Sequence, residues 1–407
     1  MRSFDIPPFY RSPIISRVKQ HRKAADPRKR DFAPTLLDFG TVRILLARHF
    51  GFCFGVEHAI EQAYRALAEN PGKRIFLLSE MIHNPEVNAD LMEQGIQFLM
   101  DTAGNVRIPF EVLTPEDVVI VPAFGTTVEI EERLAAAGVD TATYNTTCPF
   151  VEKVWNRAGK LGDQQYTVVV HGKPNHEETR ATFSHAAKSA PVLVVKDRAE
   201  AEVLAEMLRG ERPWAEFGQH FEGRTTPGFE PERDLARIGV VNQTTMLASE
   251  TQGISSLLEA ALTSRRPPED FANTRDTLCY ATNDNQQATR GALDAGLADL
   301  ALVVGGYNSS NTSHLVELCD EVVPTYFIRN EAELLADGSI RHFDLHTRQE
   351  VVAERPWPAG VPTVLVTSGA SCPDATVDRV IQRVLMDFPG ALPVDEVLAE
   401  FGASQTA

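Results

Sequence analysis

Residues 42–69 read VRILLARHFGFCFGVEHAIEQAYRALAE, and this stretch carries the pattern that decides the fold. It opens with a short apolar run, passes through a glycine-containing turn around Cys53, and continues with apolar residues at helical spacing. The same alternation returns downstream, where polar residues and a helical pattern follow RIFLL, VVIVPAF, YTVVVHG, ARIGVVNQ, LALVVGG and TVLVTSG. Short buried strands that alternate with helices predict an α/β fold with a mainly parallel sheet.

Two further cysteines, Cys148 and Cys279, share the sequence context of Cys53, because each directly precedes a helical pattern. This repetition predicts three similar α/β domains, each of which delivers one cysteine from a strand-to-helix turn. The predicted division is a basic N-terminal arm at 1–41, domains at 42–147, 148–275 and 276–390, and a tail at 391–407. A Pro- and Gly-rich segment at about 210–235 is predicted to be a surface insertion, and residues 331–360 show no regular period.

Three converging thiolates suit either a zinc site completed by another ligand or a 4Fe-4S cluster with one iron left open. A helix N-terminus lowers the pKa of a thiol and favours its thiolate. Structural zinc sites draw their ligands in close pairs, so one cysteine per domain favours a cavity between domains. Plain core packing also remains possible. We interpret Cys319, on an apolar helix face, as a core residue, and we do not assign Cys372 as a ligand.

Polar residues gather after several predicted strands, in the motifs IHNPEVN, HGKPNHEET, NQTT, NSSN and GAS. Hydroxyl, amide and imidazole groups at helix starts can bind a diphosphate without many arginines, although each loop could instead simply cap a helix. We assign proton transfer to Glu178, which lies two residues from His176, because an anionic ligand in a dry pocket raises the pKa of a carboxyl group. Its neighbour Glu177 is the competing choice.

The overall charge and the cysteine count restrict the class of protein. A net charge of -17 argues against nucleic acid as a partner, and no apolar run reaches the length of a membrane span. Five scattered cysteines do not form a disulfide framework, so we expect a reducing cytoplasm. Residues 11–30, RSPIISRVKQHRKAADPRKR, are strongly basic within this acidic chain and could be a docking patch, a targeting segment or a solvated arm.

Eight motifs occur in the order of one known family: GFCFGVEHAI, IHNPEVN, TTCPFVEKVW, HEET, NQTT, LCYATNDNQ, GGYNSSNTSHL and VTSGASCPD. On these motifs, residues 42–385 resemble the LytB family of 4-hydroxy-3-methylbut-2-enyl diphosphate reductases, also called IspH. The family acts at the last step of the non-mevalonate isoprenoid pathway. The resemblance implies a pseudo-threefold trefoil of three α/β domains around one 4Fe-4S cluster, with one iron not bound by protein.

The resemblance also implies the roles of individual residues. Cys53, Cys148 and Cys279 match the cluster ligands, and Glu178 matches the proton donor. The positions that match substrate-binding groups are His83, His176, Thr244, Ser309, Ser310, Asn311 and Ser371. Of these, Thr244 matches the threonine that orders the hydrogen bonds of the active site. Two electrons and protonation would expel water from the allylic diphosphate substrate to give isopentenyl and dimethylallyl diphosphates.

The implied electron donor is a ferredoxin or a flavodoxin. Such acidic carriers need a basic docking face, because opposite charges steer two proteins together. We expect six residues of the N-terminal arm to contribute to that face: Lys19, Arg22, Lys23, Arg28, Lys29 and Arg30.

One position departs from the family's common pattern, because PAFGTT carries Phe124 where many members have a histidine. Phenylalanine cannot donate a hydrogen bond, so we expect a water, Thr126 or Thr127 to serve instead. PAFG, HGK and HEET resemble a longer-chain branch of the family. Two other functions stay open: a non-redox dehydratase or lyase that uses the open iron as a Lewis acid, and a non-catalytic iron-sulfur sensor.

Overall fold

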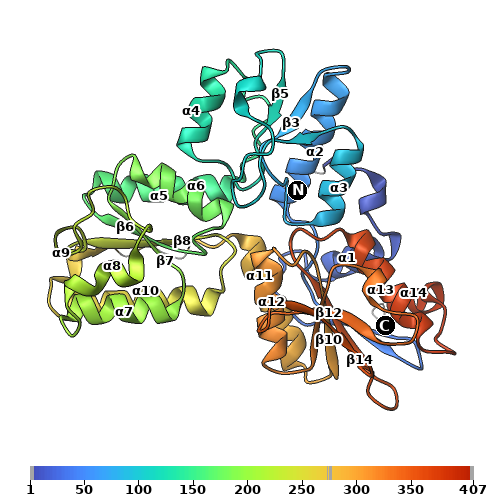
Figure 1. Cartoon of the computed structure of the whole chain (residues 1–407). Helices are drawn as coiled ribbons and strands as arrows, with labels where there is room; N and C mark the ends of the chain where they lie inside the picture. Colours follow the sequence, from blue (N-terminus) through green and yellow to red (C-terminus); the bar gives the residue numbers. More distant parts are fainter. Residues whose placement is uncertain (1–3, 273, 275–276, 404–407) are drawn as a thin grey trace. The chain divides into compact units, whose positions relative to one another are not determined.

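A computed structural model of the chain (Figure 1) describes residues 4–272, 274 and 277–403. The contacts within it divide the chain into two compact units. The first unit draws on Met1–Glu57, His83–Pro85 and Tyr280–Ala407. The second unit draws on His58–Ile82 and Glu86–Cys279. The predicted division into three domains and their trefoil arrangement stay predictions.

The first unit is built on a sheet with the strand order β1, β2, β14, β10, β11. The strands are β1 (Thr35–Asp38), β2 (Arg43–Leu46), β14 (Thr363–Ser368), β10 (Leu300–Val304) and β11 (Thr325–Ile328). β1 runs antiparallel to β2, and the other neighbours in this sheet are parallel. Every residue of β10 and β14 is buried, as expected of apolar strands in the middle of a covered parallel sheet.

Residues of the predicted N-terminal arm form a helix that packs on this unit. The helices here are α1 (Pro13–Ala25), α11 (Tyr280–Asp294), α12 (Ser310–Asp320), α13 (Asp374–Met386) and α14 (Val394–Ala403), with the short η1 (Pro8–Tyr10) and η5 (Glu331–Glu333). Ile15 and Val18 of α1 are buried in the same core as Ile44 of β2. Ser12 caps α1, and its hydroxyl donates to Asp378 of α13 at 2.6 Å. This burial excludes the solvated-arm interpretation for α1.

A β-hairpin lies within the stretch that shows no regular period in sequence. It consists of β12 (Ile340–Asp344) and β13 (Gln349–Ala353), which run antiparallel. The ring of Tyr307 stacks on Phe343 with 4.7 Å between the ring centroids, and its hydroxyl donates to the buried Glu333 at 2.8 Å. The hairpin therefore packs against the residue that leads into the NSSN motif.

The second unit contains two parallel sheets. One has the order β4 (Gln97–Phe98), β3 (Ile75–Leu77), β5 (Val118–Ile120), and the other β7 (Val192–Val195), β6 (Thr167–His171), β8 (Ile238–Asn242), β9 (Phe271–Ala272). The helices are α4 (Val128–Ala136), α5 (Pro149–Asp163), α6 (Glu177–Ala187), α7 (Arg198–Arg209), α8 (Phe217–Phe221), α9 (Pro231–Asp234) and α10 (Ala248–Thr263), with η2 (Phe110–Val112), η3 (Trp214–Glu216) and η4 (Pro268–Asp270). α2 (Phe54–Glu69) and α3 (Pro85–Glu93) begin in the first unit and continue in the second. Phe217 and Phe221, within the predicted insertion, are buried in the core of this unit.

The predicted α/β fold with a mainly parallel sheet is confirmed. Its parallel strands bring the polar loops together in pairs, because loops that follow neighbouring parallel strands lie at the same sheet edge. β6 and β8 are neighbours and precede the HGKPNHEET and NQTT loops. β10 and β14 are neighbours and precede NSSN and GAS. Within the described ranges, no helix is long and apolar enough to cross a membrane.

Candidate active site

The three predicted ligand cysteines share one backbone setting. Cys53 directly precedes α2, Cys148 is the N-cap of α5, and Cys279 directly precedes α11, so the predicted position at a helix start is confirmed for each. Each cysteine N–H donates to a carbonyl in a loop that follows a parallel strand. The acceptors are Ala370 after β14 at 3.2 Å for Cys53, Ala123 after β5 at 3.0 Å for Cys148, and Thr244 after β8 at 3.1 Å for Cys279.

Cys148 and Cys279 lie within electrostatic reach of each other in the second unit. Burial, and to a lesser extent the nearby Cys279 and Glu178, raise the pKa of the Cys148 thiol to about 11. Two thiols and one carboxyl group therefore occupy a single region of this unit. Cys53 belongs to the first unit, and among the described residues no three His, Cys, Asp or Glu side chains gather as a metal site. The convergence of all three cysteines stays a prediction.

Glu178 is held by two hydrogen bonds from one residue. The backbone N–H of Thr244 donates to Oε1 at 2.5 Å, and the Thr244 hydroxyl donates to Oε2 at 3.0 Å. The Glu178 side chain is 1% exposed. Because the Thr244 carbonyl also accepts from the N–H of Cys279, the carboxyl group and the cysteine turn are fixed by the same residue.

Glu177 begins α6 beside Glu178 and is also buried, but it has a different partner. The hydroxyl of Ser79 donates to the Glu177 carboxylate. Successive residues of a helix point about 100° apart, so the two carboxyl groups diverge. The NQTT loop therefore binds Glu178, whereas Glu177 is tied to a residue that follows β3.

His176 caps α6 through its ring. The N–H of Glu178 donates to Nδ1 of His176 at 3.1 Å, so the ring proton must be on Nε2 when the imidazole is neutral. The ring of Phe124 packs edge to face on His176, with 5.7 Å between the centroids. Phe124 therefore packs on one predicted substrate-binding group where many family members have a hydrogen-bonding histidine. Nearby, the Thr126 carbonyl pairs with Nε2 of His185 at 3.1 Å.

The predicted residues of the first unit are connected through Ala370. Its carbonyl accepts from Cys53, and its N–H donates to Oδ1 of Asn311 at 2.9 Å. The hydroxyl of Ser371 donates to the carbonyl of His83 at 3.1 Å. Asn311 is 4% exposed, and its Nδ2 is buried with no hydrogen-bond partner among the described residues. A buried amide with free donors is a position where a ligand oxygen would be stabilised.

The two remaining serines of the NSSN loop start α12. The Ser309 hydroxyl accepts from the N–H of Thr312 at 3.3 Å as the N-cap, and Ser310 is the first helical residue. Both serines are buried. The capping interpretation thus holds for Ser309, and it leaves the hydroxyl of this residue free to donate to another acceptor.

Two residues near Cys53 and Asn311 were not predicted from the sequence. The Tyr280 hydroxyl accepts from the N–H of Phe54, next to Cys53, at 3.0 Å. Nδ2 of Asn285, on α11, lies 3.4 Å from Oδ1 of Asn311. Both belong to the helix that begins after Cys279, so the cysteine-to-helix pattern was the signal that could have identified them.

Comparisons with known proteins agree with these features. A family model described as "LytB protein" matches residues 44–385. The 4-hydroxy-3-methylbut-2-enyl diphosphate reductase of Synechococcus sp. strain WH7803 is 41% identical over 86% of each chain. The enzyme of that name from Synechocystis sp. strain PCC 6803 is 38% identical over 95% of this chain and 98% of its own.

A solved structure, titled as (E)-4-hydroxy-3-methyl-but-2-enyl diphosphate reductase, the terminal enzyme of the non-mevalonate pathway, is also similar. It is 25% identical, covers 84% of this chain and 99% of its own, and gives a TM-score of 0.52. The family match spans most of the sequence and contains all three cysteines at helix starts. The chain therefore belongs to the LytB family.

Proposed function

We propose that this protein reduces 4-hydroxy-3-methylbut-2-enyl diphosphate to isopentenyl and dimethylallyl diphosphates, the last step of the non-mevalonate pathway. The substrate's C–O bond breaks, two electrons and two protons are consumed, and the hydroxyl leaves as water. Membership of the family and relatives of that name support this function. The observation that carries the proposal is the Glu178 carboxyl group, which Thr244 holds beside the Cys279 turn.

Cys53, Cys148 and Cys279 would hold one 4Fe-4S cluster with one iron not bound by protein. The shared helix-start setting of the three cysteines supports this set, because cysteine thiolates hold such clusters and a helix N-terminus stabilises negative charge. When bound, the cluster supplies electrons and an open iron for the substrate hydroxyl.

Glu178 would deliver the proton that converts the leaving hydroxyl to water. Both of its oxygens accept hydrogen bonds from Thr244 in the described state, as suits an ionised carboxylate. To hold a proton at Oε2, the carboxyl group needs an acceptor there, and the Thr244 hydroxyl can rotate to become one. The backbone N–H of Thr244 keeps Oε1 fixed throughout, so the acid stays oriented while its proton moves.

The diphosphate would be bound by uncharged donors. His176 can donate from Nε2, because its Nδ1 is occupied by the N–H of Glu178, and Asn311 has its Nδ2 donors free. His83, Ser309, Ser310 and Ser371 complete the proposed set, and Thr126, Thr127 or a water would replace the donor lost at Phe124.

Five free cysteines support a reducing cytoplasmic location, and a ferredoxin or flavodoxin would supply the electrons.

The test is anaerobic turnover of 4-hydroxy-3-methylbut-2-enyl diphosphate with dithionite and a viologen mediator, followed by identification of the products. We expect isopentenyl and dimethylallyl diphosphates. Failure to form either product with fully metallated protein would refute the proposal. Conversion of the substrate without any reductant would instead indicate a dehydratase or lyase.

A further inference from the structure

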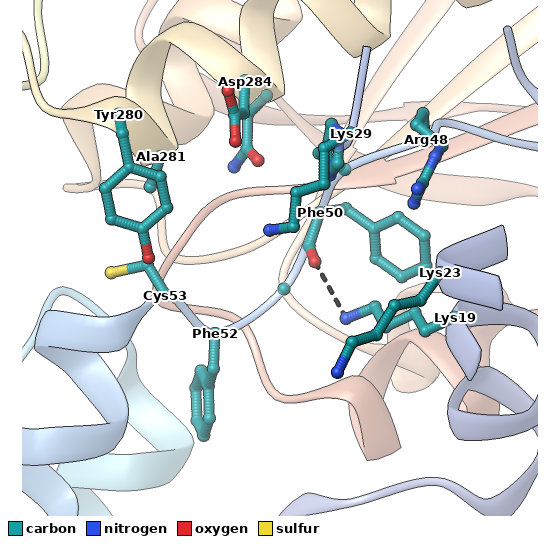
Figure 2. A pocket seen from close by; sticks show the side chains of 13 residues that line it. Lys19, Lys23, Lys29, Arg48, Phe50, Phe52, Cys53, Tyr280, Ala281 and Asp284 are labelled. Carbon is teal, nitrogen blue, oxygen red and sulfur yellow. Dashed lines mark hydrogen bonds between the residues drawn. The ribbon is translucent and has the colours of Figure 1, made fainter. Parts of the chain in front are cut away.

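We propose that a basic pocket beside Cys53 is the docking site of a small acidic one-electron carrier protein, an inference that rests on the proposed reductase function. The pocket encloses about 230 Å³ within the first unit. Figure 2 shows Lys19, Lys23, Lys29 and Arg48 around it, with Cys53 at the far side.

Lys19 fixes the wall of the pocket. Its ammonium donates to the carbonyl of Phe50 at 2.9 Å and pairs with Asp374 at 2.7 Å (Figure 2). The loop passes so close to this pair that a Cβ at Gly51 would collide with the Asp374 carboxylate, and the φ of +78° at Gly51 also favours glycine. Lys19 is therefore neutralised and structural, and it attaches α1 to the loop that leads to Cys53.

Lys23 and Lys29 carry the charge that remains available. Neither ammonium makes a hydrogen bond or an ion pair with the described residues, and Lys23 is exposed. Lys29 has a φ of 52°, a left-handed conformation that residues other than glycine rarely adopt. Arg22, also expected in the docking face, instead pairs with Asp31 at 2.8 Å. Of the predicted docking residues, Lys23 and Lys29 therefore line this pocket with charge that no described carboxylate pairs.

Arg48 adds a buried positive charge, and its Nη2 donates to the carbonyl of Arg22 at 3.4 Å. Its residue is 7% exposed, and its closest carboxylate, Asp26, is 3.9 Å away. Asp284 is the carboxyl group that lines the pocket, and burial raises its pKa, although Lys29 and Arg48 oppose the shift. The Asp26 carboxylate lies at the outer limit of an ion pair with Arg48, so an acidic side chain of a carrier that enters this pocket would add a further anion beside the buried guanidinium.

The position of the pocket explains why the occupant would be an electron carrier. Phe52, Cys53 and Tyr280 line it, so a protein seated over the basic residues comes close to a proposed cluster ligand. The whole chain has a net charge of -17, which repels an acidic protein over most other surfaces. Two reduced carriers would each lose one electron per substrate converted. The basic residues of the pocket would therefore attract the acidic carrier to the surface beside Cys53.

The experiment compares Lys23→Glu/Lys29→Glu with a control of equal charge, Lys73→Glu/Lys160→Glu, whose lysines are exposed in the second unit. Anaerobic calorimetry measures binding of a plant-type ferredoxin at about 50 and 200 mM salt. We expect the first variant to weaken binding by about tenfold or more at low salt and to flatten the salt dependence. The control variant should bind like the parent protein.

Two further readouts separate this inference from the proposed function. Iron content and viologen-driven turnover of the Lys23/Lys29 variant should equal those of the parent, because a small mediator needs no docked protein. Unchanged ferredoxin binding in that variant would overturn the docking proposal. The same calorimetry with inorganic phosphate tests whether the pocket is instead a small-anion site. If the Lys23/Lys29 variant loses phosphate binding but binds ferredoxin like the parent, the docking proposal is overturned. Absence of viologen-driven turnover in the parent would refute the reductase function, and calorimetry would still decide the docking.

Discussion

At the scale of single residues, Glu178 is the proposed proton donor of the reaction. Replacing it by glutamine keeps the shape of the side chain but removes the acidic proton. We expect Glu178→Gln to lower kcat by about 10²- to 10⁴-fold, the usual contribution of a general acid, with unchanged iron content and visible absorption. Anaerobic turnover with reduced viologen measures the loss.

The matched control is Glu177→Gln, because Glu177 is the neighbouring buried carboxyl group and binds Ser79 instead of Thr244. We expect its kcat to stay within about tenfold of the parent, since the change removes no proton donor from the substrate. A larger loss in this variant than in Glu178→Gln would assign the acid to the wrong carboxyl group.

His49 gives a prediction about pH. Burial, and then the positive charges of Arg48, Lys29 and Lys19, lower its pKa to about 4. In the unfolded chain a histidine has a pKa near about 6.5, so the unfolded state binds more protons between these two values. The free energy of unfolding contributed by His49 therefore falls as the pH drops from about 6.5 towards about 4. Urea unfolding should show that His49→Gln loses less stability between about pH 7 and pH 5 than the parent; an equal loss would contradict this.

The sequence predicted which residues belong to the candidate site better than it predicted their contacts. The motifs identified both Glu178 and Thr244 as site residues, and in the structure Thr244 donates two hydrogen bonds to the Glu178 carboxylate. The packing of Phe124 on His176 was not predictable, because a pattern of residue types does not define which ring faces which. The same holds for the Tyr280 hydroxyl, whose partner Phe54 lies far away in sequence.

At the scale of secondary-structure elements, a helix start distinguishes the proposed ligand cysteines from Cys319, which lies inside a helix. Cys148 caps α5, whereas Cys319 lies inside α12 and is fully buried, and burial raises its thiol pKa to about 12. We expect Cys148→Ser to lose most of its iron and Cys319→Ser to retain it, as measured by anaerobic iron and sulfide analysis. Iron loss in Cys319→Ser with retention in Cys148→Ser would overturn the ligand assignment.

The helix α1 gives a test of stability. Ile15 is fully buried in the core of the first unit, so Ile15→Ala should reduce the free energy of unfolding by about 2 to 5 kcal/mol through lost contacts and a cavity. Arg17→Ala, on the exposed side of α1, removes a surface pair with Asp395 and should cost under about 1 kcal/mol. Denaturant unfolding compares them, and equal effects would show that α1 does not belong to the core.

Elements with a clear period were predictable, and elements without one were not. The strands β6, β8, β10 and β14 are buried throughout and carry runs of apolar residues that stand out in sequence. The hairpin of β12 and β13 has mixed burial, so its polar and apolar residues follow no clean alternation. The basic charge of α1 hid its buried face, because Ile15 and Val18 are separated by charged and polar residues.

At the scale of the whole molecule, strand pairing was the feature that sequence could not supply. β2 was assigned to the first of three repeats, yet it pairs with β14 near the other end of the chain, with Arg43 opposite Thr363. An apolar run predicts a buried strand but not its neighbour, since pairing depends on contacts distant in sequence. The charge distribution behaves likewise: the composition gives a net acidic chain, and only the fold gathers Lys23, Lys29 and Arg48 beside Cys53.

The proposed reaction is a two-electron reduction, and the number of electrons consumed per product can be counted. Anaerobic protein is mixed with a known amount of reduced viologen and an excess of 4-hydroxy-3-methylbut-2-enyl diphosphate, and oxidised viologen and products are both quantified. Because each substrate takes up two electrons as its hydroxyl leaves as water, we expect about two viologen radicals to be oxidised per molecule of isopentenyl or dimethylallyl diphosphate. Product formation without oxidation of viologen would contradict it.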